Sequence, residues 1–438
     1  MKYNQIKKKF LYFFKKKKHR IYKSLSIINK DNSKLFFVNS GINIFKKFFL
    51  TLNNTKYNKI ANIQKCIRIT GKHNDLRSVG KDNYHHTLFE MLGNWSIGDY
   101  NIKKAIKYAW ILITKIYKIP KNRIYVTIFK GNKKKKLNKD VKTYKYWKKY
   151  INKKRILFFG FKYNFWKIEN FNLCGPSTEI HIDIRKKIYK DKELGKDLVN
   201  KNNKYLIELW NIVNIKYIIK NNKIYKNKNF LSNNFIDTGM GLERLCMILQ
   251  NKISTYDTDI FKNIINKIEK ILNIKYKSNK KNDIIIRIIS DHIRSIYLII
   301  YYNILPNNNK YGYVLRKLIR RCLIYVYKYI NIKKPFLFKL ISTVYKSMYN
   351  NNNKILSKNN YIKNILKKEE IFFFNSLKKN IKLMSLYLNK NKIKYIDEKI
   401  ILYIYSTYGI NYFIIKKIAL KNNIKIDKFK KIKKIIEL

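Results

Sequence analysis

The stretch that decides the fold lies between residues 64 and 100. Residues 64–80 read Gln-Lys-Cys-Ile-Arg-Ile-Thr-Gly-Lys-His-Asn-Asp-Leu-Arg-Ser-Val-Gly, and residues 84–100 read Tyr-His-His-Thr-Leu-Phe-Glu-Met-Leu-Gly-Asn-Trp-Ser-Ile-Gly-Asp-Tyr. Its charged and titratable side chains include Arg68, Lys72, His73, Asp75, His85, His86 and Glu90. Arginine presents a rigid fork of donors that fits a phosphate, and lysine adds a point charge. The stretch therefore predicts an anion-handling site; the alternative is a polar surface hairpin whose histidines are hydrogen-bonded in a core.

The composition of the rest of the chain sets the class of protein. The chain has 438 residues, and its 98 Lys and Arg against 26 Asp and Glu give a formal net charge of +72. This length predicts two or three domains with a large core. The charge predicts a polyanionic partner, because each neutralised phosphate releases counterions. Since Lys, Asn, Ile and Tyr are also the residues of A/T-rich codons, the charge supports nucleic-acid binding without requiring it.

The cysteines and the most apolar segment indicate the compartment. Four cysteines lie far apart with no Cys-x-x-Cys pair, at Cys66, Cys174, Cys246 and Cys322. This spacing argues against a zinc ribbon or a disulfide scaffold and favours a reducing compartment. Residues 284–302 are the most apolar window, but they contain Arg287, Asp291, His292 and Arg294. We expect a buried helix there rather than a membrane span, and a soluble, cytoplasmic protein without a signal peptide.

Hydrophobic periodicity predicts strands mixed with helices up to about residue 250 and helices thereafter. Apolar spacing, turn residues and β-branched content mark the elements. The expected helices span 103–117, 284–302, 312–329, 362–388 and 396–420, with a basic amphipathic helix within 1–30. The expected strands span 123–129 and 205–213, and residues 237–245 read as a strand that turns into a helix.

Several short sequence motifs match those of one family. They are Arg68 with Gly71–Leu76, His85–Thr87, Phe89–Gly93, Asn164–Trp166, Cys174–Ile180, Asp237–Leu245, Tyr256–Asp259, Asp291–Arg294 and Gly312–Arg316. In this order and at this spacing they resemble the alanyl-tRNA synthetase family, which belongs to the class II aminoacyl-tRNA synthetases. The chain departs from the family pattern at Glu169 and Asn172, where the family usually has glycines.

The resemblance implies the fold class and the domains. It implies an α+β protein with an antiparallel class II sheet flanked by helices. Residues 1–250 would form the catalytic domain, and residues 251–438 an all-helical tRNA-recognition domain. It also implies a short form that lacks the family's editing and C-terminal domains. We therefore expect no zinc, and we expect seryl- or glycyl-tRNA to form without being cleared, because binding alone separates such similar amino acids by about 10–200-fold.

The resemblance also implies a reaction and its residues. Alanine would attack the α-phosphorus of ATP, and alanyl-adenylate would then acylate the 3′ end of tRNA(Ala). Arg68, Lys72 and Arg244 would act on the phosphates. ATP would contact Arg68, His86, Trp166, Leu209, Trp210, Asn211, Gly241 and Arg244. Alanine would contact Asn211 and Asp237, whose carboxylate would accept the ammonium. Mg²⁺ would bridge phosphate oxygens, and we expect no metal ion held by the protein alone.

The acceptor stem of the tRNA is the remaining expected partner. Arg316, Lys317, Arg320 and Arg321 form a basic stripe at helical spacing, which suits an RNA backbone although such a stripe is often a solvated face. Family members read a G·U pair with an Asn and an Asp, but Lys310 and Ser406 occupy the matching positions here. Lysine accepts no hydrogen bond and serine is a weaker acceptor, so we expect relaxed or altered reading of this pair, unless Asn309 replaces the family Asn.

Three other functions compete with this interpretation. A catalytically inactive, synthetase-derived RNA-binding protein is expected to have lost Arg68, Asp237 or Arg244, and all three are present. An editing hydrolase needs paired His and Cys metal ligands, which the spacing does not supply. A purely structural basic protein would not concentrate Gly, His and Arg in these motifs.

Overall fold

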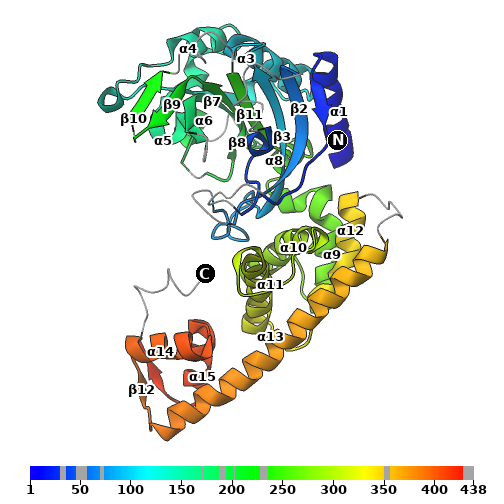
Figure 1. Ribbon diagram of the computed structural model, residues 1–438, viewed down its shortest axis with the longest axis vertical. Helices are drawn as coiled ribbons and strands as arrows, with labels where there is room; N and C mark the ends of the chain where they lie inside the picture. Colours follow the sequence, from blue (N-terminus) through cyan, green and yellow to red (C-terminus); the bar gives the residue numbers. More distant parts are fainter. Residues whose placement is uncertain are drawn as a thin grey trace. The chain divides into compact units, whose positions relative to one another are not determined.

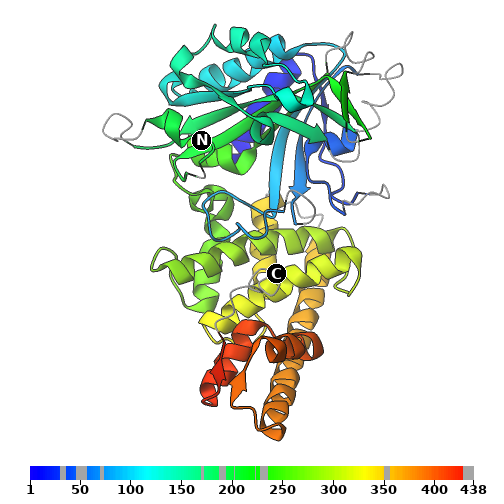
Figure 2. The same ribbon diagram turned by 90° about the vertical axis from the view of Figure 1, so that its left-hand side faces the viewer.

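A computed structural model describes residues 1–29, 36–45, 57–69, 74–168, 172–186, 194–201, 203–221, 223–226, 235–349 and 356–427. It divides the chain into two compact units, Met1–Lys262 and Asn263–Leu438. Both are shown in Figure 1 and, from another side, in Figure 2. The domain boundary expected from the sequence, between residues 250 and 251, lies shortly before this division.

A mixed sheet forms the centre of the first unit. Its described strands are β1 Arg20–Tyr22, β2 Lys59–Ile67, β3 Leu88–Ile97, β4 Ile124–Phe129, β5 Ile156–Phe159, β6 Phe165–Ile168, β7 Leu173–Asp183, β8 Leu206–Ile215, β9 Tyr217–Lys220, β10 Lys223–Lys226 and β11 Phe235–Gly241. The main order is β1-β2-β3-β11-β8-β7-β4-β5, with β6 and β9 also pairing with β7, and β10 with β9. In this spatial order, every neighbouring pair between β2 and β4 is antiparallel, which confirms the expected antiparallel sheet. The two outer pairs, β1–β2 and β4–β5, are parallel.

Helices pack against this sheet. The helical segments of the first unit are α1 Tyr3–Lys16, η1 Gly41–Phe45, α3 Ile102–Ile111, η2 Leu112–Ile116, η3 Lys121–Arg123, η4 Lys133–Lys135, α4 Val141–Trp147, η5 Lys153–Arg155, α5 Phe161–Asn164, α6 Gly195–Leu198, α8 Leu242–Leu249 and η6 Thr255–Asp257, with α9 Asp259–Leu272 leading into the second unit. α1 contacts β2, α3 contacts β8, and α8 contacts β3 and β8. The buried face of α1 carries Ile6, Phe10, Phe13 and Phe14. This confirms the amphipathic helix expected near the N-terminus.

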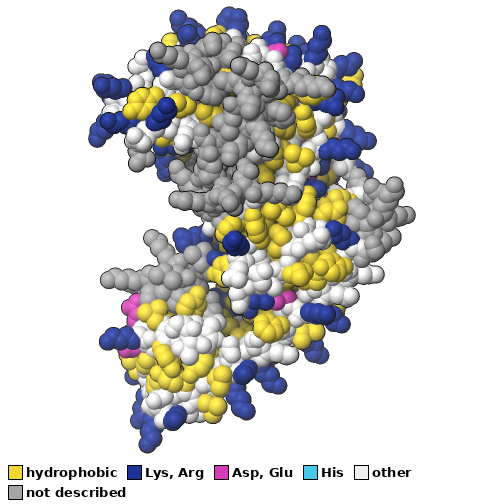
Figure 3. All heavy atoms as spheres, in the orientation of Figure 1, with side chains coloured by type: hydrophobic (Ala, Val, Ile, Leu, Met, Phe, Trp, Pro, Cys, Tyr) yellow, Lys and Arg dark blue, Asp and Glu magenta, His cyan; other side chains and the backbone are white. Residues whose placement is uncertain are grey.

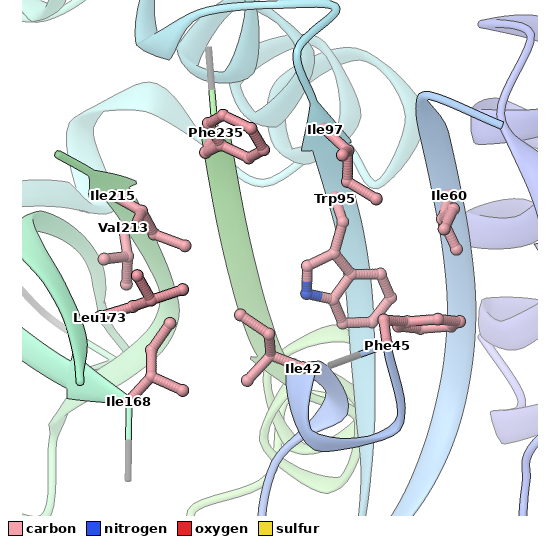
Figure 4. Close-up of a cluster of buried hydrophobic side chains, with 10 residues drawn as sticks. All are labelled: Ile42, Phe45, Ile60, Trp95, Ile97, Ile168, Leu173, Val213, Ile215 and Phe235. Carbon is pink, nitrogen blue, oxygen red and sulfur yellow. The ribbon is translucent and has the colours of Figure 1, made fainter. Parts of the chain in front are cut away.

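A cluster of apolar side chains surrounds the indole of Trp95, near the C-terminal end of β3 (Figure 4). Trp95 is fully buried, and Phe45 packs on it with ring centroids 4.8 Å apart. A Cβ placed on Gly93 would lie 2.1 Å from this ring, so only glycine leaves room for the indole there. The four cysteines are also buried, and all are free.

The second unit is mainly helical. Its described elements are α10 Lys280–Tyr301, α11 Lys310–Tyr329, η7 Leu337–Leu340, α12 Ile341–Tyr349, α13 Leu356–Lys390, β12 Tyr395–Ile396, α14 Glu398–Tyr408, α15 Tyr412–Lys421 and β13 Lys425–Ile426. The long α13 connects α12 to the smaller group formed by α14 and α15, as Figures 1 and 2 show. β12 and β13 pair in parallel, so a two-stranded ladder accompanies the expected helices.

Charged groups are buried within α10, the helix that contains the most apolar window. Asp291 and His292 are fully buried, and the Nδ1 of His292 lies 2.9 Å from the carboxylate of Asp291. The other ring nitrogen, Nε2, lies 3.2 Å from the guanidinium of Arg321 on α11. Asp291 and His292 thus each have a partner, as burial requires. The expected buried helix is confirmed, and within the described ranges no helix combines the length and apolar character that a membrane crossing needs.

The helix expected over 396–420 is two helices. Gly409 follows α14 with φ of +61°, a left-handed conformation that ends a helix at little cost when the residue is glycine. Asn411 then caps α15 by accepting a hydrogen bond from the backbone N–H of Phe413. The prediction of one continuous helix was wrong because the apolar periodicity continues across this turn.

Candidate active site

A cavity of about 420 Å³ opens over the sheet of the first unit, which is within the usual size of small-molecule sites. Eight of the residues predicted to bind ATP or alanine line it, namely Arg68, His86, Trp166, Leu209, Asn211, Asp237, Gly241 and Arg244. Sequence reasoning missed several further wall residues, including Tyr84, Met91, Glu179, His181 and Val213. Trp210 is not on the cavity wall, and Lys72 lies outside the described residues.

A bulge in β8 explains which residues of this strand face the cavity. Asn211 pairs with Glu179 of β7, but His181 pairs with Glu208, so Leu209 is an extra residue in β8. The bulge therefore puts Glu208, Leu209 and Asn211 on the same wall. Trp210 is 1% exposed, and its indole N–H has no hydrogen-bond partner among the described residues.

Arg68 follows the end of β2 and presents its guanidinium at the cavity. Its Nε donates to the backbone oxygen of Asn39 at 3.0 Å, and its planar group lies 4.9 Å from the ring centre of Phe89. Within the described part of the chain, no carboxylate lies within ion-pair distance of it. The guanidinium is thus held in orientation while its charge stays available for an anion.

Arg244 stands on α8, directly after the glycine turn that ends β11. It donates to the backbone oxygen of Glu208 at 2.7 Å and lies 3.5 Å from the carboxylate of the same residue. The ring centre of Tyr84 lies 4.9 Å from its guanidinium. Burial alone would raise the pKa of Glu208, but Arg244, followed by His181 and Arg68, lowers it below its usual value. Glu208 therefore contributes a negative charge beside Arg244 on the cavity wall.

Asp237 on β11 is one of the buried carboxylates of the cavity. It is 8% exposed, and the indole N–H of Trp95 donates to its Oδ1 at 2.7 Å. Burial raises the pKa of Asp237 to about 6, and the hydrogen bond from Trp95 limits the rise. No described cation lies within ion-pair distance of this carboxylate, and its Oδ2 has no hydrogen-bond partner in the described ranges. The geometry suits a small ligand that brings its own positive charge.

A network around Glu179 connects β4, β7 and β8. Its carboxylate accepts from the hydroxyl of Thr127 at 2.9 Å and from the amide of Asn211 at 3.4 Å, and it lies 3.1 Å from the Nε2 of His181. Burial raises the pKa of Glu179, while the hydrogen bond from His181 opposes the rise. The Oδ1 of Asn211 has no hydrogen-bond partner among the described residues. Glu179 thus holds Asn211 so that an acceptor remains for a ligand.

Two side chains of the deciding stretch are held by other parts of the fold. The carboxylate of Glu90 accepts from Lys7 at 2.7 Å and from Tyr3 at 2.6 Å, so it anchors the N-terminal helix. Its expected place in an anion-handling site was wrong because residues 89 and 91 of β3 line the cavity and the strand alternates. His86 reaches the cavity wall, but its Nε2 lies 2.8 Å from the hydroxyl of Thr255 and its ring stacks on Phe261.

The residues predicted to contact tRNA all lie in the second unit. Lys310 and Ser406 are exposed, and Lys310 begins α11 with φ of +41°. Arg316 makes a bidentate pair with Glu369 of α13, at 2.8 and 3.2 Å. Arg320 lies 3.9 Å from the same carboxylate. Lys317 is partly exposed on the same helix, and Arg321 meets His292 as described above.

The chain belongs to the class II tRNA synthetases: the family model described as "tRNA synthetases class II (A)" matches residues 5–437. Its curated relatives include proteins named alanine–tRNA ligase. Those of Cytophaga hutchinsonii and Christiangramia forsetii are 42% and 41% identical over 430 and 410 residues. The matches cover 97% and 93% of this chain but 48% and 47% of the relatives, so the chain spans about half their length. The relative from Porphyromonas gingivalis is 36% identical over 97% of this chain and 48% of its own length.

Solved structures of two other synthetases also match. The pyrrolysyl tRNA synthetase of Desulfitobacterium hafniense has a TM-score of 0.32 and 12% identity, covering 58% of this chain and 71% of that chain. Apo histidyl-tRNA synthetase of S. aureus has a TM-score of 0.33 and 11% identity, covering 61% of this chain and 75% of that chain.

Proposed function

We propose that this chain activates L-alanine with ATP and transfers the alanyl group to the 3′ end of tRNA(Ala). The observation that carries the proposal is one cavity with a buried carboxylate, Asp237, on one of its strands and two arginines, Arg68 and Arg244, beside it. The relatives named alanine–tRNA ligase support the choice of amino acid. Neither step needs a nucleophile from the protein, because both depend on neutralised phosphate charge and held geometry.

The residues take roles that follow from their surroundings. Asp237 would accept the ammonium of alanine through Oδ2, while Trp95 holds Oδ1. Asn211 would accept a second hydrogen bond from the substrate through its free Oδ1. Arg68 would neutralise the α-phosphate as the carboxylate attacks, and Arg244 would meet the distal phosphates. The predicted roles of Trp166, Leu209 and Gly241 as walls of the nucleotide site are part of the same proposal.

Mg²⁺ fits this cavity as a companion of ATP. No group of three or more His, Cys, Asp or Glu suited to a metal ion occurs in the described part of the chain. Glu208 is partly exposed and its pKa is lowered, whereas both oxygens of Glu179 already accept hydrogen bonds. Glu208 would therefore be the protein ligand, and the phosphates would supply the remaining oxygens, as is usual for Mg²⁺. When bound, the ion neutralises phosphate charge.

The second unit would recognise the acceptor stem of the tRNA, in the translation machinery of the cytoplasm. Figure 3 shows Lys and Arg side chains spread over the visible face of both units, with few acidic ones between them. Such a surface attracts a polyanion with strong salt dependence. Because Glu369 neutralises Arg316 and lies close to Arg320, we assign most of the phosphate contacts to lysines, beginning with the exposed Lys310 and the partly exposed Lys317.

The test is alanine-dependent exchange between ATP and radioactive pyrophosphate, followed by charging of tRNA(Ala) with radioactive alanine. Exchange that requires alanine, and charging that requires tRNA, are the expected results. An inactive RNA-binding protein would bind tRNA but show neither reaction, and that outcome would refute the proposal. Glycine and serine in place of alanine measure the selectivity of the same site.

A further inference from the structure

The cavity has a part that the proposed reaction of ATP with alanine does not use. It is lined by side chains of α5 and of the segment that enters β8, namely Lys162, Tyr163, Asn200, Asn203 and Leu206. These five residues form the β4 side of the cavity, because both segments pack near that strand. α5 contacts β4, and Leu206 belongs to the same buried cluster as Tyr125 of β4.

The β4 side lies across the sheet from Asp237 and Arg244. Asn164 of α5 is fully buried and donates to the hydroxyl of Thr127 on β4 at 2.7 Å, which fixes the neighbouring Tyr163 beside this strand. Asp237 is on β11, and Arg244 follows that strand. Because β8 and β7 lie between β11 and β4, three strand spacings, roughly 14 Å, separate the strands that carry the two sides.

The turn before β8 presents an amide that lacks a partner. Val199 and Leu206 are buried at its two ends. Asn200 has φ of +61°, a left-handed conformation that asparagine tolerates, and it lines the cavity. Its Nδ2 is buried and has no hydrogen-bond partner among the described residues. Since an unsatisfied buried donor is costly, this amide suits a ligand that brings an acceptor.

The other groups of the β4 side suit a nucleotide. Tyr163 is partly exposed, and the ammonium of Lys162, an exposed residue, lies 5.2 Å from the centre of its ring. Asn203 accepts from the backbone N–H of Tyr205 at 2.7 Å, which orients a second amide. Proteins hold single-stranded nucleic acid with aromatic rings that stack on bases, polar groups that bind base edges and cations along the backbone. The β4 side combines these three kinds of group.

The transfer step requires room for the end of a tRNA beside the alanyl group. In this step the ribose hydroxyl attacks the carbonyl carbon of alanyl-adenylate. The ester bond forms as the bond to the phosphate oxygen breaks, AMP leaves, and the hydroxyl proton is released to water. The phosphates would lie at Arg68 and Arg244 and the ammonium at Asp237, so that side of the cavity is filled. The β4 side remains for the nucleotide that carries the hydroxyl.

We propose that the β4 side of the cavity binds the terminal nucleotide of tRNA during alanyl transfer. The base stacks on Tyr163 and accepts from the amide of Asn200, and Lys162 meets a phosphate of the tRNA end. This inference rests on the proposed function, since it assigns residues to the RNA end that receives the alanyl group. The β4 side therefore acts in the second step of the reaction and not in the first.

The experiment compares the wild-type chain with Tyr163→Ala, Tyr163→Phe, Lys162→Gln and Asn200→Gly, the last of which suits the left-handed backbone. Pyrophosphate exchange needs no tRNA and reports the first step, whereas kcat/KM for tRNA(Ala) in charging reports both. We expect Tyr163→Ala to lower this kcat/KM by about 5- to 150-fold, the size of one lost base-stacking contact. The exchange KM values for ATP and alanine should change by less than about twofold. Tyr163→Phe keeps the ring and should equal the wild type, while Lys162→Gln and Asn200→Gly should each lower kcat/KM for tRNA by about 2- to 10-fold.

A tRNA(Ala) whose terminal nucleotide lacks its base tests the same contact from the other partner. The wild type should charge it more slowly by a factor close to that of Tyr163→Ala. The variant should add less than about threefold to this loss, because one contact is removed from both ends. Lys204→Gln is the matched control: its ammonium also lies over the next tyrosine, 4.9 Å from the ring centre of Tyr205, but Lys204 does not line the cavity. This variant should equal the wild type in both assays.

Three results would overturn the inference. They are unchanged charging by Tyr163→Ala, a rise in the exchange KM for ATP or alanine as large as the loss in charging, and losses that multiply when this variant meets the base-free tRNA. If Tyr163→Ala fails to fold, Lys162→Gln and Asn200→Gly decide, and wild-type charging by both refutes the inference. Absence of alanine-dependent exchange in the wild type would instead refute the proposed function itself.

Discussion

Replacing Asp237 by Asn separates the functional and structural roles of the buried carboxylate. An Asn oxygen can still accept from the indole of Trp95, so the hydrogen bond at 2.7 Å survives, while the negative charge is lost. Leaving a buried ammonium without its partner costs about 3–5 kcal/mol. We therefore expect kcat/KM for alanine to fall by about a hundredfold to a few thousandfold in pyrophosphate exchange, while tRNA binding on a filter stays unchanged.

The fold should respond in the opposite direction. Because burial raises the pKa of Asp237 from 3.8 to about 6, the ionised carboxylate costs the empty fold about 3 kcal/mol above pH 6. The native state binds this proton more tightly, so this cost grows as the pH rises from about 4 to about 6. Asp237→Asn should keep or raise the Tm at pH 7.5 and lose this pH dependence. A clearly lower Tm with normal alanine activation would refute the reasoning, because the carboxylate would then be structural.

Three further predictions concern the second unit. Glu370→Ala should lower the free energy of unfolding, measured in urea, by about 3 kcal/mol or more. The Glu370 carboxylate accepts from the backbone N–H groups of residues 336–338, and each group left unsatisfied costs about 1–3 kcal/mol. An unchanged unfolding midpoint would contradict this prediction. Arg316→Ala should lower the stability of the fold more than it lowers the affinity for tRNA. A double-mutant cycle with Glu369→Ala should give a coupling in the free energy of unfolding of about 1–3 kcal/mol. Additive effects would show that the pair does not form in solution. Minihelices with G·U or G·C at the identity pair should be charged at similar rates because Lys310 and Ser406 replace the family acceptors, whereas a strong G·U preference would show that another residue reads the pair.

The sequence predicted the cavity residues best where a short motif combines glycine with one charged residue. Arg68 comes directly after a strand, and Arg244 lies in the first turn of a helix that begins after Gly241. The local backbone then sets the direction of the side chain, so the neighbouring residues in the sequence are enough to predict that direction. The strands β4, β8 and β11 and most helices were predictable for the same reason, since their periodicities are local.

The wall formed by β8 was not predictable in the same way. Side chains of a regular strand alternate between its two faces, so Leu209 and Asn211 are expected on one face and Trp210 on the other. The structure agrees, since Leu209 and Asn211 line the cavity and Trp210 does not. It also predicts that Glu208 points away, yet the bulge brings Glu208 to the cavity. The bulge depends on the pairing of β7 with β8, so a single strand does not reveal it. The surroundings of His86 likewise depend on a residue as distant as Thr255.

The unequal number of charges in this chain makes carboxylates more informative than cations. With 98 Lys and Arg against 26 Asp and Glu, a basic stripe says little, and a remote Glu369 can neutralise Arg316 without any local sign. A buried carboxylate is expected to find a protein cation easily in such a chain, as Glu90 does with Lys7. Asp237 has none within ion-pair distance in the described ranges, although its burial makes the charge costly. The missing partner is the reason to expect that a ligand brings the cation, and the ammonium of an amino acid fits the one oxygen that Trp95 leaves free.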